Sequence, residues 1–142
     1  MIVYENGAPH IVSFQYSDAG RSMSRRPRSK NDCTVRALAV VCEVSFDDAY
    51  DALAQKGREP HRGFRIPKRL YIGVWKLTWQ AFQAVKGEPR VTPWRFVQSH
   101  PQGRYILRVS KHVCAVLDGV IIDDHCFDPG RCVYGAWTAE RI

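Results

Sequence analysis

Apolar positions recur at helical spacing in two neighbouring segments, and this pattern predicts two consecutive helices. The first begins near Cys33, with Asn31 or Asp32 as its N-cap. Its apolar stripe consists of Val35, Leu38, Ala39 and Cys42. The second helix follows Ser45 in a capping-box pattern and ends at Gly57. These segments define a helical part of the chain that begins directly at a cysteine.

Alternating apolar and polar positions predict strands at both ends of the chain. In the last third the predicted strands are 104–109, 112–117 and 120–124. The last two flank Asp118-Gly119, a strong signal for a tight hairpin turn. A second hairpin is predicted over residues 2–16, around the turn-rich segment 5–9.

The segments between these elements carry weaker patterns. Residues 17–30, 58–72 and 125–137 are predicted to be loops, and residues 74–86 show mixed helix and strand periodicity. Thr92 followed by proline predicts the start of a short helix. The order of elements indicates an α+β fold in which an N-terminal hairpin and helices pack on one side of a C-terminal antiparallel sheet.

Composition adds bounds on domain number and surroundings. The 142 residues, 45% apolar and 25% charged, suit a single globular domain over 1–142. No apolar run approaches the roughly 20 residues that span a bilayer, so we expect no membrane partner. The five cysteines are odd in number and no signal-peptide pattern precedes them, which favours a reducing, cytoplasmic location.

The net charge of +7 favours an anionic partner. Basic residues cluster in segments 21–30 and 58–69, and Trp75 lies close enough in sequence to offer a stacking surface. These features suit an acidic protein or, less well, nucleic acid. Arg36, Lys111 and Trp75 are therefore candidates for a substrate or partner surface.

Cys33 is the candidate nucleophile. A thiol becomes nucleophilic as a thiolate, and a helix N-terminus stabilises that negative form. Lys30 and Arg36 add positive charge nearby, and the helix start offers a backbone N–H as an oxyanion donor. Asn31 and Asp32 are supporting candidates beside it.

His112 is the candidate base and Asp123 its candidate orienting partner. With Asp118-Gly119 as a two-residue turn, Leu117 faces Val120 and Asp123 falls on the same sheet face as His112. A one-residue slip would put Asp124 there instead, so both carboxylates stay open at this point. The predicted triad is Cys33, His112 and Asp123.

These residues resemble papain-like cysteine peptidases. The resemblance is carried by Asn31-Asp32-Cys33 opening an apolar helix and by His112 opening a strand before Asp118-Gly119 and Asp123. It covers residues 14–57 and 101–129 and is nearest to small phage or prophage proteins and to bacteriocin-leader-processing peptidases. Pro27 stands where that pattern has glutamine as an oxyanion donor, and Asn31 would take its place. Lys111 replaces a small residue before the histidine.

The resemblance implies a thiol hydrolase with a papain-like fold that acts on a peptide or protein amide without a cofactor. It also implies a phage-encoded protein with a target in the bacterial host cytoplasm, and it leaves residues 58–90 as the specificity region. Rival readings are deamidation or transglutamination by the same triad, and a non-catalytic protein that binds an acidic partner or nucleic acid. A zinc site is not expected, because the spacing of the candidate ligands fits no common pattern. These ligands are Cys114, His125, Cys126 and Cys132.

Overall fold

A computed structural model describes residues 2–5, 7–128 and 130–142 of the chain. Its helices are α1 (Cys33–Val41), α2 (Phe46–Gln55) and α3 (Pro93–Ser99), and a 3₁₀ turn, η1, spans Arg21–Met23. Its strands are β1 (Ile2–Glu5), β2 (Ala8–Ile11), β3 (Phe14–Tyr16), β4 (Arg69–Ile72), β5 (Trp75–Ala81), β6 (Arg104–Val109), β7 (His112–Leu117), β8 (Val120–Asp123) and β9 (Gly135–Arg141). The predicted α+β class is confirmed.

Within the described residues, seven strands form one sheet in the order β3-β8-β7-β6-β9-β5-β4. The strands predicted in the last third are present as β6, β7 and β8, and Leu117 pairs with Val120 as the hairpin register predicts. The expectation of a purely antiparallel, C-terminal sheet is wrong, however. β3 runs parallel to β8, and β4 and β5 from the middle of the chain complete the sheet.

The helix caps confirm the sequence signals at two of the three helices. The Ser45 side chain accepts a hydrogen bond from the Asp48 N–H, and the Thr92 hydroxyl accepts one from the Arg95 N–H. Asp32 holds the N-cap position of α1, but its side chain makes no capping hydrogen bond. Among the described residues, no helix is long and apolar enough to cross a bilayer.

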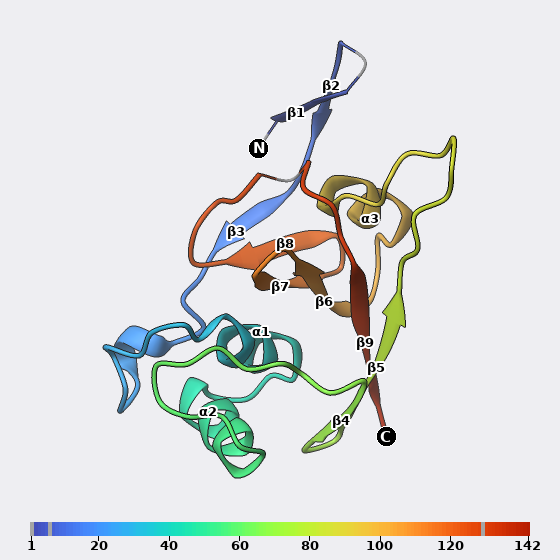
Figure 1. Ribbon diagram of the computed structural model, residues 1–142. Coiled ribbons are helices and arrows are strands. Elements are labelled where there is room, and N and C mark those ends of the chain that lie inside the picture. Colours follow the sequence, from blue (N-terminus) through green and yellow to red (C-terminus); the bar gives the residue numbers. More distant parts are fainter. Residues whose placement is uncertain (1, 6, 129) are drawn as a thin grey trace.

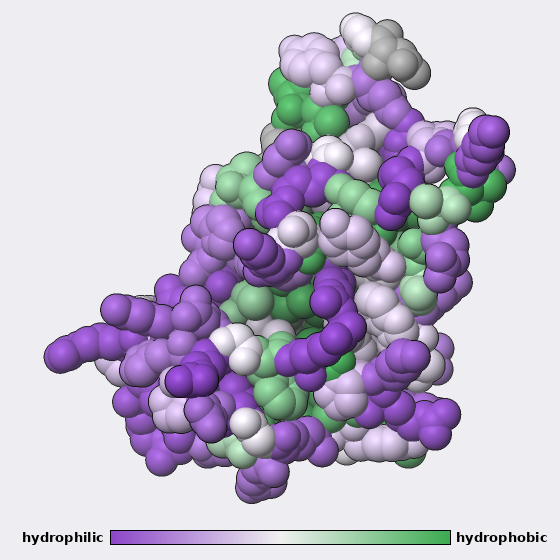
Figure 2. Space-filling view, in the orientation of Figure 1, coloured by the Kyte–Doolittle hydropathy of each residue, from purple (hydrophilic) through white to green (hydrophobic). Residues whose placement is uncertain are grey.

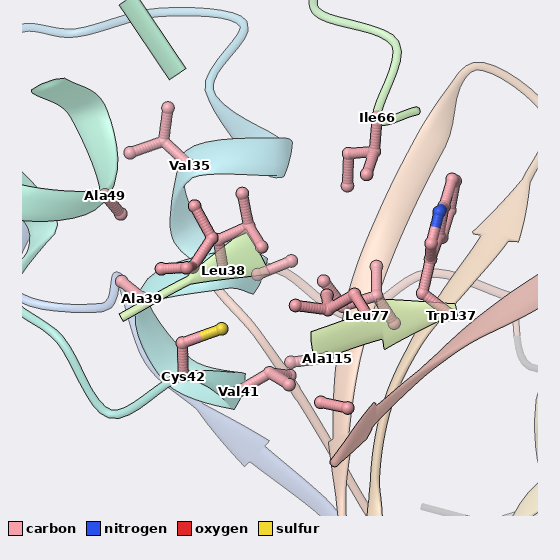
Figure 3. Packing of buried hydrophobic residues seen from close by; sticks show 14 of the residues in the cluster. Val35, Leu38, Ala39, Val41, Cys42, Ala49, Ile66, Leu77, Ala115 and Trp137 are labelled. Atoms are coloured by element: carbon pink, nitrogen blue, oxygen red, sulfur yellow. The ribbon is translucent and has the colours of Figure 1, made fainter. Parts of the chain in front are cut away.

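The sheet is covered on both faces, which corrects the expectation that helices pack on one side only. Figure 1 shows α1 and α2 together at one side of the sheet and α3 at the other. The apolar residues of α1 and α2 form one core with the sheet; in Figure 3, Val35 lies beside Ala49 of α2, and Leu38 lies on the side of Leu77 and Ala115. Residues of α3 build a second core on the opposite face.

The N-terminal hairpin exists but does not join the large sheet. β1 and β2 pair with each other alone, and the predicted second strand divides, because Phe14 begins β3 and pairs with Ile121 of β8. The predicted turn over 5–9 is also narrower, since β1 extends to Glu5 and β2 begins at Ala8. Asn6 lies outside the described residues.

β4 and β9 were not predicted, β5 was left open between helix and strand, and burial explains the case of β9. β9 lies between β6 and β5, so Gly135, Ala136 and Trp137 are all buried and show no alternation. The last three residues of the loop expected over 125–137 therefore belong to a strand. β5 occupies the segment of mixed periodicity, and β4 occupies part of the expected loop over 58–72.

We expect Gly135→Ala to destabilise the protein by about 1–3 kcal/mol, because the added methyl has no room. A Cβ at Gly135 would overlap the ring of Trp79 and the carbonyl oxygen of Gln80. Gly63→Ala is the matched control, since nothing lies within 4 Å of the equivalent position. Denaturant unfolding of both variants measures the difference, and equal stabilities would contradict this packing.

Candidate active site

Cys33 and His112 face the same space between α1 and the sheet. Cys33 is the first residue of α1 and is half-buried, and His112 is the first residue of β7. α1 packs against β7, so the start of the helix meets the start of the strand. Both side chains line the same two cavities. The structure thus brings together the two residues that the sequence indicated as nucleophile and base.

The His112 ring is held by Asp123. Its Nε2 lies 2.5 Å from Oδ2 of Asp123, which is buried at the end of β8. Because Nε2 is occupied in this way, Nδ1 is the ring nitrogen left for Cys33. In the β7–β8 hairpin Ala115 pairs with Ile122. Continued by one residue, this register places Asp123 on the face of the sheet that carries His112, as predicted.

Asp124 turns away from His112 and joins arginines instead. Its Oδ1 lies 2.9 Å from Arg36 Nη1, and its Oδ2 accepts a hydrogen bond of 3.2 Å from Arg21. The same Oδ1 lies 2.6 Å from Nδ1 of His125. Asp123 and Asp124 were both candidates for the carboxylate that orients His112, and Asp123 is the one that contacts the imidazole.

The surroundings of Cys33 favour the thiolate. Burial raises the pKa of the thiol. Hydrogen bonds from His112 and the Val113 backbone lower it, as do the charges of His112 and Arg36, and together these effects exceed that of burial. The net pKa is lowered from its ordinary value. Burial without such partners has the opposite effect at Cys42, whose pKa is raised to about 12. Activation is therefore a property of the position of Cys33.

The surroundings of His112 favour the imidazolium. Burial lowers its pKa, but the hydrogen bond and charge of Asp123 and those of Cys33 raise it more, to about 9. Its shift is opposite in direction to that of the Cys33 thiol. A lowered thiol pKa beside a raised imidazole pKa means that the thiolate–imidazolium pair is favoured at neutral pH.

Arg36 is largely buried, only 8% exposed, and it lines the larger cavity while its guanidinium binds carboxylates inside the protein. Its Nε donates to Asp32 at 2.9 Å, and its Nη1 donates to Asp123 at 2.6 Å. Arg21 also binds Asp32, at 3.1 Å. Burial raises the pKa of Asp123, but hydrogen bonds from His112 and Arg36 lower it overall, so the carboxylate stays ionised.

The start of α1 offers backbone donors to an anion. The first intrahelical hydrogen bond runs from Arg36 N to Asp32 O at 2.9 Å, and the N–H groups of Cys33 and Thr34 precede it. Since Asp32 does not cap the helix, its side chain leaves these N–H groups open. The Asn31 amide, in contrast, donates to the His61 carbonyl at 2.9 Å. Backbone groups of α1 are thus better placed than Asn31 as oxyanion donors.

Two cavities meet at Cys33 and His112. The smaller, about 240 Å³, lies toward β6 and β9, and the larger, about 800 Å³, lies toward the loop before α1. Lys111 lines both cavities, as expected for a residue on the substrate side. It adopts a positive φ of 56° in the β6–β7 turn, next to His112. Pro27 lines the larger cavity but, as proline, offers no N–H there.

Trp75 is not at the site, which corrects its prediction as a surface residue. It is buried in β5, and the guanidinium groups of Arg104 and Arg141 stack on its ring. It lines neither of the two cavities at Cys33.

Much of the basic segment 21–30 is neutralised within the protein. Arg25 and Arg26 form ion pairs with Asp47 and Asp51 of α2, and Arg21 binds Asp32 and Asp124. These arginines therefore fasten the loop that leads to Cys33 onto the helices. This arrangement leaves less free positive charge for nucleic acid than the sequence indicated.

Metal-ligand types also meet at this place. Ligand atoms of His112, Asp123 and His125 lie within 4.8 Å of one another, and the rings of the two histidines are 5.0 Å apart. Within the described part of the chain, the candidate zinc ligands Cys114, Cys126 and Cys132 form no such group. Since Asp123 and His112 already bind each other, an ion would have to break the pair that orients the imidazole.

Several residues at the cavities were missed by sequence reasoning. They are Thr34, Gly63, Phe64, Arg65, Ile66, Arg108, Val113 and Trp137. Thr34 and Val113 directly follow Cys33 and His112 in the sequence, and Arg108 could have been located because the short β6–β7 turn pairs it with Val113. Residues 63–66 belong to the loop between α2 and β4, inside the segment 58–90 that the resemblance left as the specificity region, and Trp137 lies on β9, which was not predicted.

The arrangement combines an activated thiol, an imidazole oriented by a buried carboxylate, and open backbone donors. Such a group can attack a carbonyl carbon and transfer a proton to the leaving atom. Comparison with protein-family models, curated proteins and solved structures gives no match to this chain.

Proposed function

We propose that this protein is a cysteine-dependent acyl-transfer enzyme that hydrolyses a peptide or protein amide. The proposal rests on one observation: Cys33 begins a helix beside His112, and the far ring nitrogen of His112 is bound to buried Asp123. A cysteine helix packed on strands that carry histidine and aspartate is also what a papain-like enzyme requires. No cofactor is needed for this chemistry.

Each step of the reaction has a residue to perform it. The Cys33 thiolate attacks the carbonyl carbon, and the N–H groups of Cys33 and Thr34 stabilise the oxyanion. The C–N bond then breaks as the His112 imidazolium gives its proton to the departing amine, which leaves a thioester on Cys33. Water next loses a proton to His112 and attacks the thioester, and this releases a carboxylic acid and restores the Cys33 thiolate beside the His112 imidazolium.

Alkylation of Cys33 by iodoacetamide tests the activated pair. We expect Cys33 to react fast at pH 7, and His112→Ala to slow it by roughly 10²-fold, because burial then raises the thiol pKa without compensation. The reactivity should persist to acidic pH and change as the pH rises through about 9, where His112 loses its proton. Peptide mass spectrometry over a range of pH measures the rate at each cysteine.

Cys126 is exposed and provides an internal standard for the alkylation rate. His100→Ala, at the C-terminal end of α3, is the matched histidine control. A Cys33 rate equal to that of Cys126, with no effect of His112→Ala, would contradict the proposal. Intact-mass measurement of a modified target then separates chain cleavage from side-chain deamidation.

A further inference from the structure

The smaller cavity beside Cys33 joins an apolar floor to a basic rim. Its apolar lining consists of Phe64, Ile66, Val113 and Trp137, and its basic lining consists of Arg65, Arg108 and Lys111. Among the residues that the structure describes, no aspartate or glutamate lines it. Figure 2 shows apolar surface at the bottom of a hollow in the middle of this face, with hydrophilic side chains around it.

The basic side chains of this rim lack the carboxylate partners that neighbouring arginines have. Arg104 and Arg108 are four residues apart in β6, so their side chains lie on the same face of the strand. Arg104 pairs with Glu43. Within the described residues, Arg108, Arg65 and Lys111 form no ion pair. Arg108 is nevertheless half-buried, where an unpaired charge is costly. The rim is therefore complementary to an anion that the protein itself does not supply.

A buried hydroxyl in the same cavity also lacks a partner. The Thr34 side chain lines the cavity next to Cys33, and the residue is only 3% exposed. Its Oγ1 makes no hydrogen bond with the described part of the protein. A buried hydroxyl without a partner is destabilising, so it marks a place where a bound molecule can complete the hydrogen bonding.

The cavity wall is held in place before any ligand arrives. The loop between α2 and β4 runs across α1 (Figure 1), and four hydrogen bonds hold it. Trp137 Nε1 donates to the Pro67 carbonyl at 2.9 Å, and Asn31 donates to the His61 carbonyl. Arg58 donates back to the carbonyls of Lys30 and Asn31, the residues before the site. The cavity is thus preorganised.

We propose that this cavity binds a carboxylate on a short aliphatic stem, next to the carbonyl that Cys33 attacks. The stem packs on Trp137 and its apolar neighbours, the carboxylate meets Arg108 and the other cations, and Thr34 donates a hydrogen bond. The inference rests on the acyl-transfer function proposed above and names its substrate class, an acidic peptide. Two sources supply this group: a glutamate side chain or a peptide's own C-terminus.

A peptide suits the cavity better than nucleic acid does. A phosphate backbone is recognised along an open basic groove with exposed aromatic platforms. Here the cations surround a confined space lined by two aromatic residues, Phe64 and Trp137, of which Trp137 is buried at the floor. The space also ends at a nucleophile suited to a carbonyl.

Two alkylating reagents of similar size but different charge test the anion preference. Iodoacetate carries the carboxylate and iodoacetamide does not, so we measure the ratio of their rates at Cys33. We expect iodoacetate to be favoured, and Arg108→Gln to lower the ratio about fivefold by weakening the local positive potential. The preference should also weaken as salt is added. Arg25→Gln, an exposed arginine paired with Asp47 and Asp51, is the charge-matched control and should leave the ratio unchanged.

Protection of Cys33 from iodoacetamide then identifies the source. A short alanine peptide blocked at both ends, with one central glutamate, is compared with its glutamine counterpart and with an unblocked alanine peptide. Protection by the glutamate peptide assigns a side chain, and protection by the unblocked peptide assigns the C-terminus. Equal protection by the glutamine peptide, or protection by an oligonucleotide alone, would overturn the inference.

The two proposals fail in distinguishable ways. Fast reaction of Cys33 with iodoacetamide, but no preference for iodoacetate and no effect of Arg108→Gln, overturns the carboxylate site alone. Slow reaction with both reagents, at the rate of an ordinary thiol, overturns the acyl-transfer function instead.

Discussion

Replacing Asp123 with asparagine is expected to lower turnover of an activated ester such as p-nitrophenyl acetate by roughly 10³–10⁴-fold, the scale seen when a serine-protease aspartate is changed in this way. The amide can no longer stabilise the imidazolium and can hold the ring in the wrong tautomer. The pKa of His112, about 9 in the intact site, should fall toward its ordinary value of roughly 6.5. Ester turnover and NMR titration of the His112 ring measure the two effects.

Asp124→Asn is the matched control for this change. Asp124 is adjacent in sequence and has the same chemistry, but it binds Arg36 and Arg21 and makes no hydrogen bond to His112. Its replacement should leave the His112 titration in place and reduce turnover far less. Equal losses in the two variants, with both proteins folded by circular dichroism, would show that Asp123 has no special part in the reaction.

Replacing Arg36 with leucine is expected to destabilise the fold by about 3–5 kcal/mol, because it leaves buried carboxylates without their cation. Arg36 binds Asp32 and Asp123, both of which are buried, and also Asp124. The loss should shrink at acidic pH. The lowered pKa of Asp123 means that its paired carboxylate adds stability above pH ~4, and that this contribution disappears as the pH falls through the folded-state pKa.

Arg25→Leu is the control for Arg36→Leu. Arg25 also pairs with two aspartates, but its side chain is 72% exposed, so the expected cost is only about 0–1 kcal/mol. Urea unfolding at pH 7 and at pH 3 gives the loss of unfolding free energy for each of the two variants at each pH. A cost for Arg36→Leu as small as that of Arg25→Leu, or one that does not change with pH, would contradict this role of Arg36.

The fold was predictable where local signals decide the structure. Ser45 and Thr92 start helices because their side chains cap them, and Asp118-Gly119 sets the β7–β8 hairpin by its turn geometry. β9 was not predictable, because a strand buried on both faces carries no alternation and here begins at a glycine. The parallel pairing of β3 with β8 depends on residues far apart in the sequence, which no local pattern reveals.

The same distinction applies to the candidate site. Hairpin register placed Asp123 on the face of His112 but left Asp124 open in case of a one-residue slip, and the structure shows the contact with Asp123. Arg36 was expected to face a substrate or partner, yet its guanidinium is bound by three aspartates of the protein itself. Asn31 was expected to point at the substrate, but the loop at His61 takes its amide. Both errors come from tertiary partners that the sequence does not show.

The position of Cys33 early in the chain has a consequence for synthesis on the ribosome. The bond between Arg36 and Asp123 joins residues 87 positions apart, and His112 also follows Cys33 at long range. α1 therefore leaves the ribosome well before the strands that activate its thiol. During that interval Cys33 has the pKa of an ordinary cysteine, roughly 8.5. In the nascent chain the Cys33 thiol therefore has the reactivity of an ordinary cysteine. It becomes activated only when β7 and β8 have been made and have folded onto α1.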